Sequence, residues 1–297
     1  MHNPYQIKSD LHLHTSASDG RLEPGQIVDL AVIEGLDVIA ITDHDTVEGV
    51  GAALSIAHKY HSISVIPGVE ISTDVPKTEV HVLGYFLDFT SNILLKTLKE
   101  LRMSRETRAL QMIDKLSKLG MNIKWERLVA LSKGGSIGRP HVAQALVEAG
   151  YVDSFKVAFD KYIGRSCPAY VEHKKMSPIE VIKLIIEVKG LPVLAHPNNI
   201  ENLEVILPEL KNNGLVGIEI YYGGYTENII ERLVRLANKY DLIPTGGSDY
   251  HAFHEENEIN IGGAQPPTDS VIKLFNLAND RNPEYMVKYN LSLKNKR

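Results

Sequence analysis

The sequence contains few thiols and no long apolar run. Its 297 residues include one cysteine, Cys167. Because a disulfide needs two thiols and a zinc–thiolate site needs several, this chain can build neither by itself. No run of about 18 apolar residues occurs, so the sequence predicts no membrane-spanning helix. The first ten residues, MHNPYQIKSD, show no basic segment followed by an apolar one. We therefore expect a cytoplasmic protein without a signal peptide.

An excess of basic residues is also missing. Lys and Arg together number 32 and Asp and Glu 37, which gives a formal net charge of −5. This balance argues against a broad basic surface that would bind duplex nucleic acid. A small phosphorylated ligand remains compatible with it, because bound metal ions can reverse the charge of a site.

Strand-like and helix-like segments alternate over the first ninety residues. Strands are predicted over 8–15, 38–45, 64–72 and 80–88, and helices over 21–35 and 46–60. The strands are nearly continuous apolar runs with polar ends, a pattern that indicates a buried parallel sheet. The alternation resumes at residue 177, where Ser177, Pro178 and Glu180 form a predicted capping box at the start of a helix.

Residues 91–168 break this rhythm, because they contain helical patterns and no clear strand. We predict a helical insertion subdomain there, with barrel segments over 1–90 and 169–297; an ordinary run of barrel helices is the alternative. About seven strands with intervening helices predict the α/β class, as a distorted (β/α)7 TIM-like barrel.

Residues that can bind metals fall at the predicted strand ends, where such barrels place their active sites. Each has an ordinary explanation when taken alone: His44 could cap a helix, His196 could be a core histidine and Asp249 could be an N-cap. Together they predict a metal site. The candidate ligands are His12, His14, Asp19, His44, Glu70, His81, His196, Asp249 and His251.

The chemistry of these side chains narrows the choice of metal. Imidazole and carboxylate suit zinc, manganese, iron or nickel, and nine candidates exceed the needs of one tetrahedral ion, so two or three ions are expected. Asp43 is predicted to orient an imidazole and Asp45 to cap a helix. The remaining histidines are predicted to be surface residues: His2, His58, His61, His173 and His254.

Six segments, taken in order, resemble the motifs of the PHP (polymerase and histidinol phosphatase) phosphoesterases. They are DLHLHTSASDG, ITDHDTVEG, PGVEIS, HVLGY, LAHP and GGSDYH. The segment IGRPHVAQALVEAG looks like the branch with the 3′,5′-nucleotide bisphosphate phosphatases and a 5′-to-3′ exonuclease of short RNA. The resemblance implies a PHP fold and three metal ions, most often manganese, with iron or zinc as alternatives.

The resemblance also distributes the ligands among the ions. His12, His14, Glu70 and Asp249 would hold the first ion. Glu70 would bridge to a second ion, bound also by His81 and His196. The third ion would be held by Asp19, His44 and His251.

The activity implied is removal of the 3′-phosphate from nucleoside 3′,5′-bisphosphates, with trimming of short 5′-phosphorylated oligonucleotides, by attack of a metal-bridging hydroxide. Arg139 and His141 are the predicted substrate-binding residues, and His141 is also the predicted general acid; a plain helix start is the alternative reading of GRPH. Other functions left open are a phosphatase for histidinol phosphate or a similar small ester, and a non-catalytic metal-binding module. Neither duplex nucleic acid nor a membrane is an expected partner.

Overall fold

A computed structural model describes residues 6–60, 62–75, 78–132, 134–172, 176–253, 258–291 and 293. Of the five histidines predicted to lie on the surface, His58 is exposed. The other four lie outside the described residues.

Seven strands form one sheet in chain order. They are β1 (Ser9–Leu13), β2 (Val38–Ile41), β3 (Ser64–Val75), β4 (Thr78–Tyr85), β5 (Leu191–Leu194), β6 (Gly217–Tyr222) and β7 (Ile243–Gly247). The two edges meet where the amide of His14 donates to the carbonyl of Tyr250 at 3.1 Å and the amide of Asp249 donates to the carbonyl of His12 at 3.0 Å. The predicted distorted barrel is confirmed.

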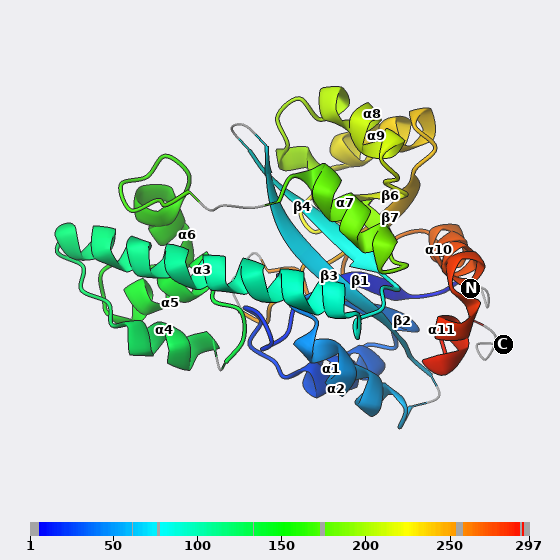
Figure 1. Cartoon of the computed structure of the whole chain (residues 1–297), viewed down its shortest axis with the longest axis horizontal. Coiled ribbons are helices and arrows are strands. Elements are labelled where there is room, and N and C mark those ends of the chain that lie inside the picture. Colours follow the sequence, from blue (N-terminus) through cyan, green and yellow to red (C-terminus); the bar gives the residue numbers. More distant parts are fainter. Residues whose placement is uncertain are drawn as a thin grey trace.

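One strand runs against the predicted direction. β4 is antiparallel to both β3 and β5, whereas the other neighbouring pairs are parallel. The prediction of a fully parallel sheet is therefore wrong, because two residues between β3 and β4 suffice for a hairpin but not for a crossover. The hairpin also continues β3 to Val75, beyond the predicted end of that strand at residue 72 (Figure 1).

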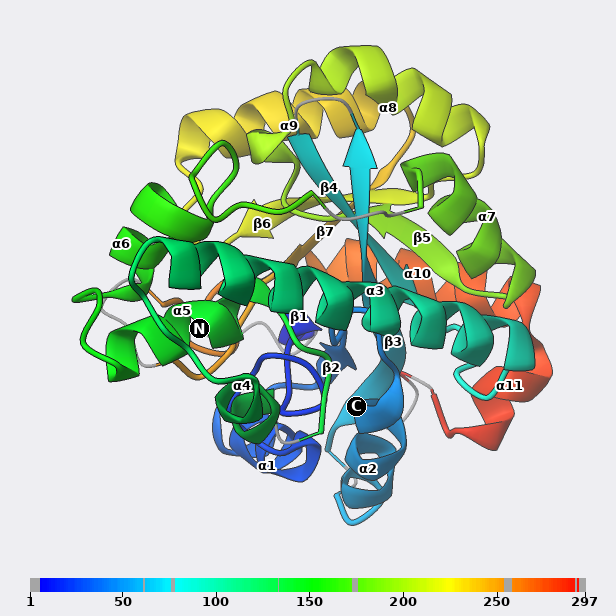
Figure 2. The same ribbon diagram turned by 60° about the vertical axis from the view of Figure 1, so that its left-hand side comes forward.

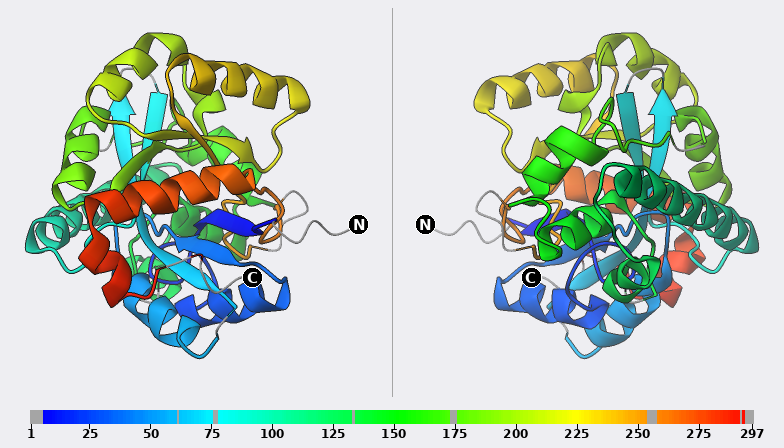
Figure 3. Two further views of the ribbon diagram at one scale, coloured as in Figure 1. Left: turned by 90° about the vertical axis from the view of Figure 1, so that its right-hand side faces the viewer. Right: turned by 90° about the vertical axis from the view of Figure 1, so that its left-hand side faces the viewer.

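Helices surround the strands on all sides (Figure 3). They are α1 (Pro24–Ile33), α2 (Glu48–Ala57), α3 (Asn92–Lys118), α4 (Trp125–Ser132), α5 (Arg139–Glu148), α6 (Phe155–Ala158), η1 (Phe159–Ile163), α7 (Pro178–Glu187), η2 (Pro197–Asn199), α8 (Leu203–Asn212), α9 (Glu227–Lys239), α10 (Thr268–Arg281) and α11 (Pro283–Lys288). The capping box of α7 is confirmed, since the amide of Glu180 donates to the hydroxyl of Ser177 and the Glu180 carboxylate accepts from the amide of Ser177.

The long helix α3 joins two parts of the molecule (Figures 1 and 2). Leu94, Leu98 and Leu101 in its first half pack into the apolar cluster around the barrel. Met112 and Leu116 in its second half pack into a separate cluster with α4, α5 and α6. This arrangement lets α3 carry side chains from the helical region to the rim of the barrel. The domain boundary at residue 91 stays a prediction.

Among the described residues, we find no helix with the length and apolar character that crossing a membrane would require.

Candidate metal centre

The structure brings the nine predicted ligand residues together at one end of the barrel. Ligand atoms of His12, His14, Glu70 and Asp249 lie within 4.8 Å of one another, as do those of His44, Glu70 and His81. A third group shares the same spacing: His14, Asp19, His44 and His251. The antiparallel direction of β4 places His81 opposite Ser72 of β3 and thus at the same rim.

Glu70 lies at the centre of the cluster. Its Oε2 is 3.2 Å from Nε2 of both His12 and His14, and its Oε1 is 2.7 Å from Nδ1 of His81 and 3.0 Å from Nε2 of His196. One carboxylate thus faces imidazoles on both sides. This is the geometry expected of a residue that bridges two metal ions.

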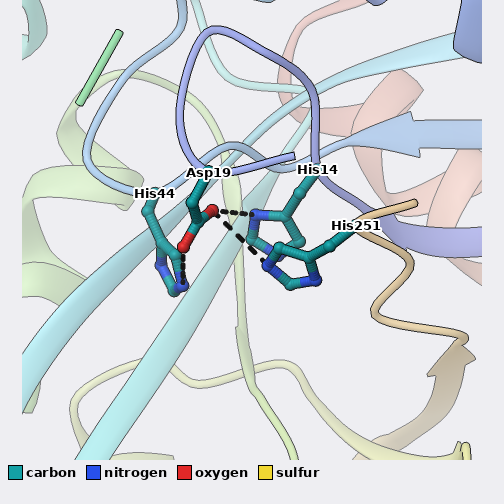
Figure 4. Close-up of side chains that lie close together, drawn as sticks. All are labelled: His14, Asp19, His44 and His251. Atoms are coloured by element: carbon teal, nitrogen blue, oxygen red, sulfur yellow. Dashed lines mark ion pairs between the residues drawn. The ribbon is translucent and has the colours of Figure 1, made fainter. Parts of the chain in front are cut away.

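Asp19 lies among three histidines of the cluster (Figure 4). Its carboxylate lies 3.4 Å from His251, 3.6 Å from His14 and 3.9 Å from His44. The loop that carries Asp19 folds back on β1, where the amide of Gly20 donates to the carbonyl of Thr15 at 3.0 Å. A Cβ at Gly20 would lie 2.6 Å from the carbonyl oxygen of His14, so the turn excludes a side chain.

Asp43 holds this loop in place. It accepts hydrogen bonds from the amide and hydroxyl of Thr15, each at 2.7 Å, and from the hydroxyl of Ser18 at 2.6 Å. In the described part of the chain the hydrogen bonds of the Asp43 carboxylate go to the loop that carries Asp19, and three of them leave the carboxylate with acceptor capacity. Its predicted role of orienting an imidazole stays a prediction.

The loop before α5 touches the same turn from the helical region. The amide of Ser136 donates to the carbonyl of Ala17 at 3.0 Å. A Cβ at Gly135 would lie 2.6 Å from that carbonyl oxygen. The position of the Asp19 loop is therefore set from both the barrel and the helical region.

Buried ligand atoms without hydrogen bonds test whether a metal ion fits. Within the described chain these atoms are Nε2 of His12, both ring nitrogens of His14, Oδ1 of Asp19, Nδ1 of His44, Oε2 of Glu70 and Oδ1 of Asp249. Buried polar atoms are costly unless something pairs with them. Nitrogen and carboxylate oxygen are the donors that divalent transition metals accept, so the donor set fits such ions.

The pKa shifts differ among the candidate ligands. Burial would raise the pKa of Glu70, but His44, His81 and His12 outweigh it and hold that pKa well below its usual range. Burial outweighs the carboxylates of Glu70 and Asp19 at His44 and keeps the pKa of that imidazole well below its ordinary value. The neighbouring carboxylates outweigh burial at His12 and His14 and raise the pKa of both imidazoles. Metal binds the ionised carboxylate and the neutral imidazole, so binding would release protons from His12 and His14.

Two residues that the sequence reasoning missed hold ligands in place. Glu219, fully buried in β6, lies 3.0 Å from Nδ1 of His12 and accepts from the amide of His196 at 2.7 Å. Tyr222 donates its hydroxyl to Oδ2 of Asp249 at 2.8 Å. A glutamate inside the apolar strand VGIEIYY was the available signal, because a buried carboxylate needs a partner.

A cavity of about 110 Å³ lies beside the nine candidate metal ligands, the metal-type cluster. Three arginines form part of its wall. Arg105 and Arg108 come from α3, and Arg139 from the start of α5. The cavity is also lined by His44 and His81, so it opens directly onto the cluster. Sequence reasoning found Arg139 but not the two arginines of α3, which look like ordinary charges on an exposed helix.

The contacts of Arg105 contradict the role that was predicted for Asp45. It forms an ion pair with Asp45 through Nε and donates Nη2 to the hydroxyl of Ser72 at 2.6 Å. Asp45 was predicted to cap a helix; it instead anchors Arg105 and accepts from the amide of Ser72 at 3.1 Å. The side chain of Arg105 is therefore fixed in the cavity wall.

Arg139 and His141 differ in their placement. Arg139 lies in the cavity wall, pairs with Glu79 and packs over the ring of Phe159 with its guanidinium carbon 5.5 Å from the ring centroid. His141 is 5% exposed, and its Nδ1 accepts from the amide of Gly138 at 3.0 Å. The cavity lining includes Arg139 and not His141. A catalytic role for His141 stays a prediction.

Comparison with known proteins places the chain among phosphoesterases. Residues 10–164 match the PHP domain family. A 5′-3′ exoribonuclease of Haemophilus influenzae is 34% identical over 90% of this chain and 98% of its own length. A 3′,5′-nucleoside bisphosphate phosphatase of Chromobacterium violaceum is 30% identical over 82% of this chain and 87% of its own length.

A solved structure agrees in fold. A protein of Bifidobacterium adolescentis, assigned by prediction as a metal-dependent phosphoesterase, superposes with a TM-score of 0.84 and 29% identity, covering 91% of this chain and 96% of the other. With its barrel and its cluster of metal-type side chains, the chain is a metal-dependent phosphoric ester hydrolase. It belongs to the PHP domain family, whose match spans more than half of its 297 residues.

Proposed function

We propose that this enzyme hydrolyses the phosphate ester on the 3′ side of a nucleotide that carries a 5′-phosphate. Its substrates are nucleoside 3′,5′-bisphosphates, which lose the 3′-phosphate, and short 5′-phosphorylated oligonucleotides. The observation that supports this most directly is the arginine-walled cavity, which opens onto the metal-type cluster through His44 and His81. One phosphorus would lie at the cluster and the second phosphate in the cavity.

The proposed metal ligands are the nine clustered residues. His12, His14, Glu70 and Asp249 would hold one ion, and Glu70 with His81 and His196 a second. Asp19, His44 and His251 would hold a third, close enough to His14 for that ring to be shared. We propose two or three divalent ions, manganese first among them. When bound, such ions activate water and neutralise the oxygens of the reacting phosphate.

The arginines supply recognition. A guanidinium group presents a planar set of donors that matches phosphate oxygens. Burial lowers the pKa of Arg108 to about 10, which still leaves it charged at neutral pH. Three guanidinium groups against the carboxylates of Asp19 and Glu79 give the cavity wall a net positive charge, which favours a ligand with a second phosphate over one with a single phosphate.

This arrangement accounts for two activities in one site. The same 5′-phosphate can sit in the cavity whether the 3′ oxygen carries a terminal phosphate or the next nucleotide. In the first case hydrolysis releases inorganic phosphate, and in the second it releases a nucleoside 5′-monophosphate. The relatives named for bisphosphate hydrolysis and for 5′-3′ RNA hydrolysis fit this common geometry.

The test is hydrolysis by purified enzyme of known metal content in the presence of Mn²⁺. Four substrates are compared: a nucleoside 3′,5′-bisphosphate, a nucleoside 3′-monophosphate, histidinol phosphate and a 5′-phosphorylated dinucleotide. We expect the bisphosphate and the dinucleotide to be cleaved with a much higher kcat/KM than the other two. Equal rates on the 3′-monophosphate, or activity on histidinol phosphate alone, would contradict the proposal.

A further inference from the structure

The cavity wall contains two carboxylates, Asp19 of the candidate metal ligands and Glu79, which pairs with the arginines. Glu79 lies on β4, two residues before His81, and both side chains line the cavity. The carboxylate forms an ion pair with Nη2 of Arg139 and lies 3.9 Å from Nη2 of Arg108. Two of the three guanidinium groups thus share a single negative side chain.

The partners of the arginines show which of them an incoming anion can engage. Arg105 is held by Asp45 and Ser72. Arg108 is 8% exposed, donates Nε to the carbonyl of Val171 at 2.8 Å and packs over the ring of Tyr170. Its Nη2 is buried and has no hydrogen-bond partner among the described residues. Within the described part of the chain, Arg108 therefore offers a donor that lies next to Glu79 and is not used in a hydrogen bond.

A ligand that enters the cavity must compete with this carboxylate for Arg108 and Arg139. A carboxylate brings one negative charge and two acceptor oxygens. A terminal phosphate brings close to two charges and three free oxygens, so it gains more from the same guanidinium groups. A phosphodiester brings one charge and two free oxygens, which gives it no electrostatic advantage over the residue already there.

We propose that Glu79 sets the affinity that an anion must exceed to bind in this cavity, acting as a resting counter-ion of Arg108 and Arg139 that a terminal phosphate displaces and an esterified phosphate does not. The inference rests on the proposed function, because it assumes that the second phosphate of the substrate binds here. It explains how the enzyme would start at a phosphorylated end of a chain and leave internal positions alone.

The experiment compares two ligands by calorimetry on the metal-loaded enzyme: a nucleoside 5′-monophosphate and the same nucleotide with a methyl ester on its 5′-phosphate. In the unaltered enzyme we expect the monophosphate to bind about tenfold more tightly or better. In Glu79→Gln neither ligand has to displace a carboxylate, so both bind more tightly, and the monophosphate, which displaces it in full, gains at least as much as the methyl ester. Glu126→Gln on the exposed face of α4 makes the same change in net charge and leaves both affinities unaltered.

The outcomes separate the possible failures. Weaker or unchanged binding of the monophosphate in Glu79→Gln overturns the role of Glu79. A methyl ester that gains nothing in Glu79→Gln also overturns it, because the methyl group and not the carboxylate would then exclude the ester. Binding of the monophosphate that is insensitive to Arg108→Gln places the ligand elsewhere and contradicts the proposed function itself. Should Glu79→Gln fail to fold, Glu79→Asp keeps the charge but moves it back by one methylene, and tighter binding of the monophosphate than in the unaltered protein is expected.

Discussion

At the scale of single residues, the site contains two kinds of polar side chain, and mutations can distinguish their roles. His12 belongs to the metal-type cluster, whereas Arg139 belongs to the adjoining cavity. We expect His12→Ala to lose bound metal and activity together. We expect Arg139→Ala to retain its metal and to raise KM for the bisphosphate roughly ten- to a hundredfold, because a charged hydrogen bond contributes about 1.5–3 kcal/mol.

Metal analysis beside steady-state kinetics checks this pair. Lys156→Ala, on the exposed surface of the helical region, is a control that removes a positive charge without touching the cavity. Loss of metal in Arg139→Ala, or an unchanged KM, would contradict the separation.

His141 gives a prediction about pH. Its folded-state pKa is lowered, first of all by burial, so the unfolded chain takes up a proton on this ring more readily than the folded one. The contribution of His141 to stability is therefore present above the unfolded pKa of about 6.5 and is lost as the pH falls below it. We expect the loss in unfolding free energy between about pH 8 and about pH 5.5 to be smaller in His141→Gln than in the unaltered protein.

Urea unfolding of both proteins after chelation measures the difference. The other histidines are common to the two proteins, so their contributions cancel in the comparison. A pH dependence that is identical in both would show that His141 keeps its ordinary pKa.

The residues that sequence reasoning missed share one physical property. Arg105 and Arg108 carry the same local pattern as exposed charges elsewhere on α3, and only the docking of α3 against the barrel buries them. Glu79 gave no signal either, since a single acid before a strand is commonplace. The histidines were found because their spacing placed them together at strand ends, which is a property of the chain and not of its packing.

At the scale of elements, the strand order could be predicted from apolar runs with polar ends, and the direction of β4 could not. The direction of a strand depends on the length of the connection that precedes it. The two residues between Val75 and Thr78 are too few for the crossover that a parallel pair needs. Helical periodicity located α1 but not its packing in detail. Ile33 is apolar but lies on the opposite side of the helix from Ala31, and it is 77% exposed.

We expect substitution by alanine to have opposite effects on stability at two glycines, Gly247 in β7 and Gly51 in α2. Gly247 ends β7 against β1, where a Cβ would lie 2.4 Å from Cβ of His12. Gly51 lies in α2 with nothing within 4 Å of an added Cβ. We expect Gly247→Ala to lower the unfolding free energy by about 1–3 kcal/mol and to weaken metal binding by displacing His12. We expect Gly51→Ala to raise the unfolding free energy by about 0.5–1 kcal/mol.

Urea unfolding and metal titration of the two variants test this contrast. Full stability and metal affinity in Gly247→Ala would show that β1 and β7 can separate without cost to the site.

At the scale of the whole molecule, the metal ions should contribute to folding as well as to catalysis. Their proposed ligands come from β1, β3 and β4 and from the segments after β1, β2, β5 and β7, so bound ions would link the barrel around its circumference. A ligand bound only to the folded state at 100 times its Kd stabilises that state by about 2.7 kcal/mol. We expect chelation to lower the melting temperature by several degrees.

Calorimetry before and after chelation measures the change, and addition of Mn²⁺ should restore the original melting temperature. Ca²⁺, which prefers oxygen ligands, is the control and should restore little. Identical melting with and without chelator in a protein shown to bind Mn²⁺ would contradict the expectation.

The contact between Gly135 and Ala17 bears on how this family can be re-engineered. A backbone carbonyl of the Asp19 loop and a glycine of the helical region meet with no room for even a methyl group. A helical region transplanted from a relative into this barrel would meet that loop at a contact that tolerates no misfit. Chimeras should therefore exchange residues 15–20 and 134–138 together, so that the loop of Asp19 keeps its position against the new helical region.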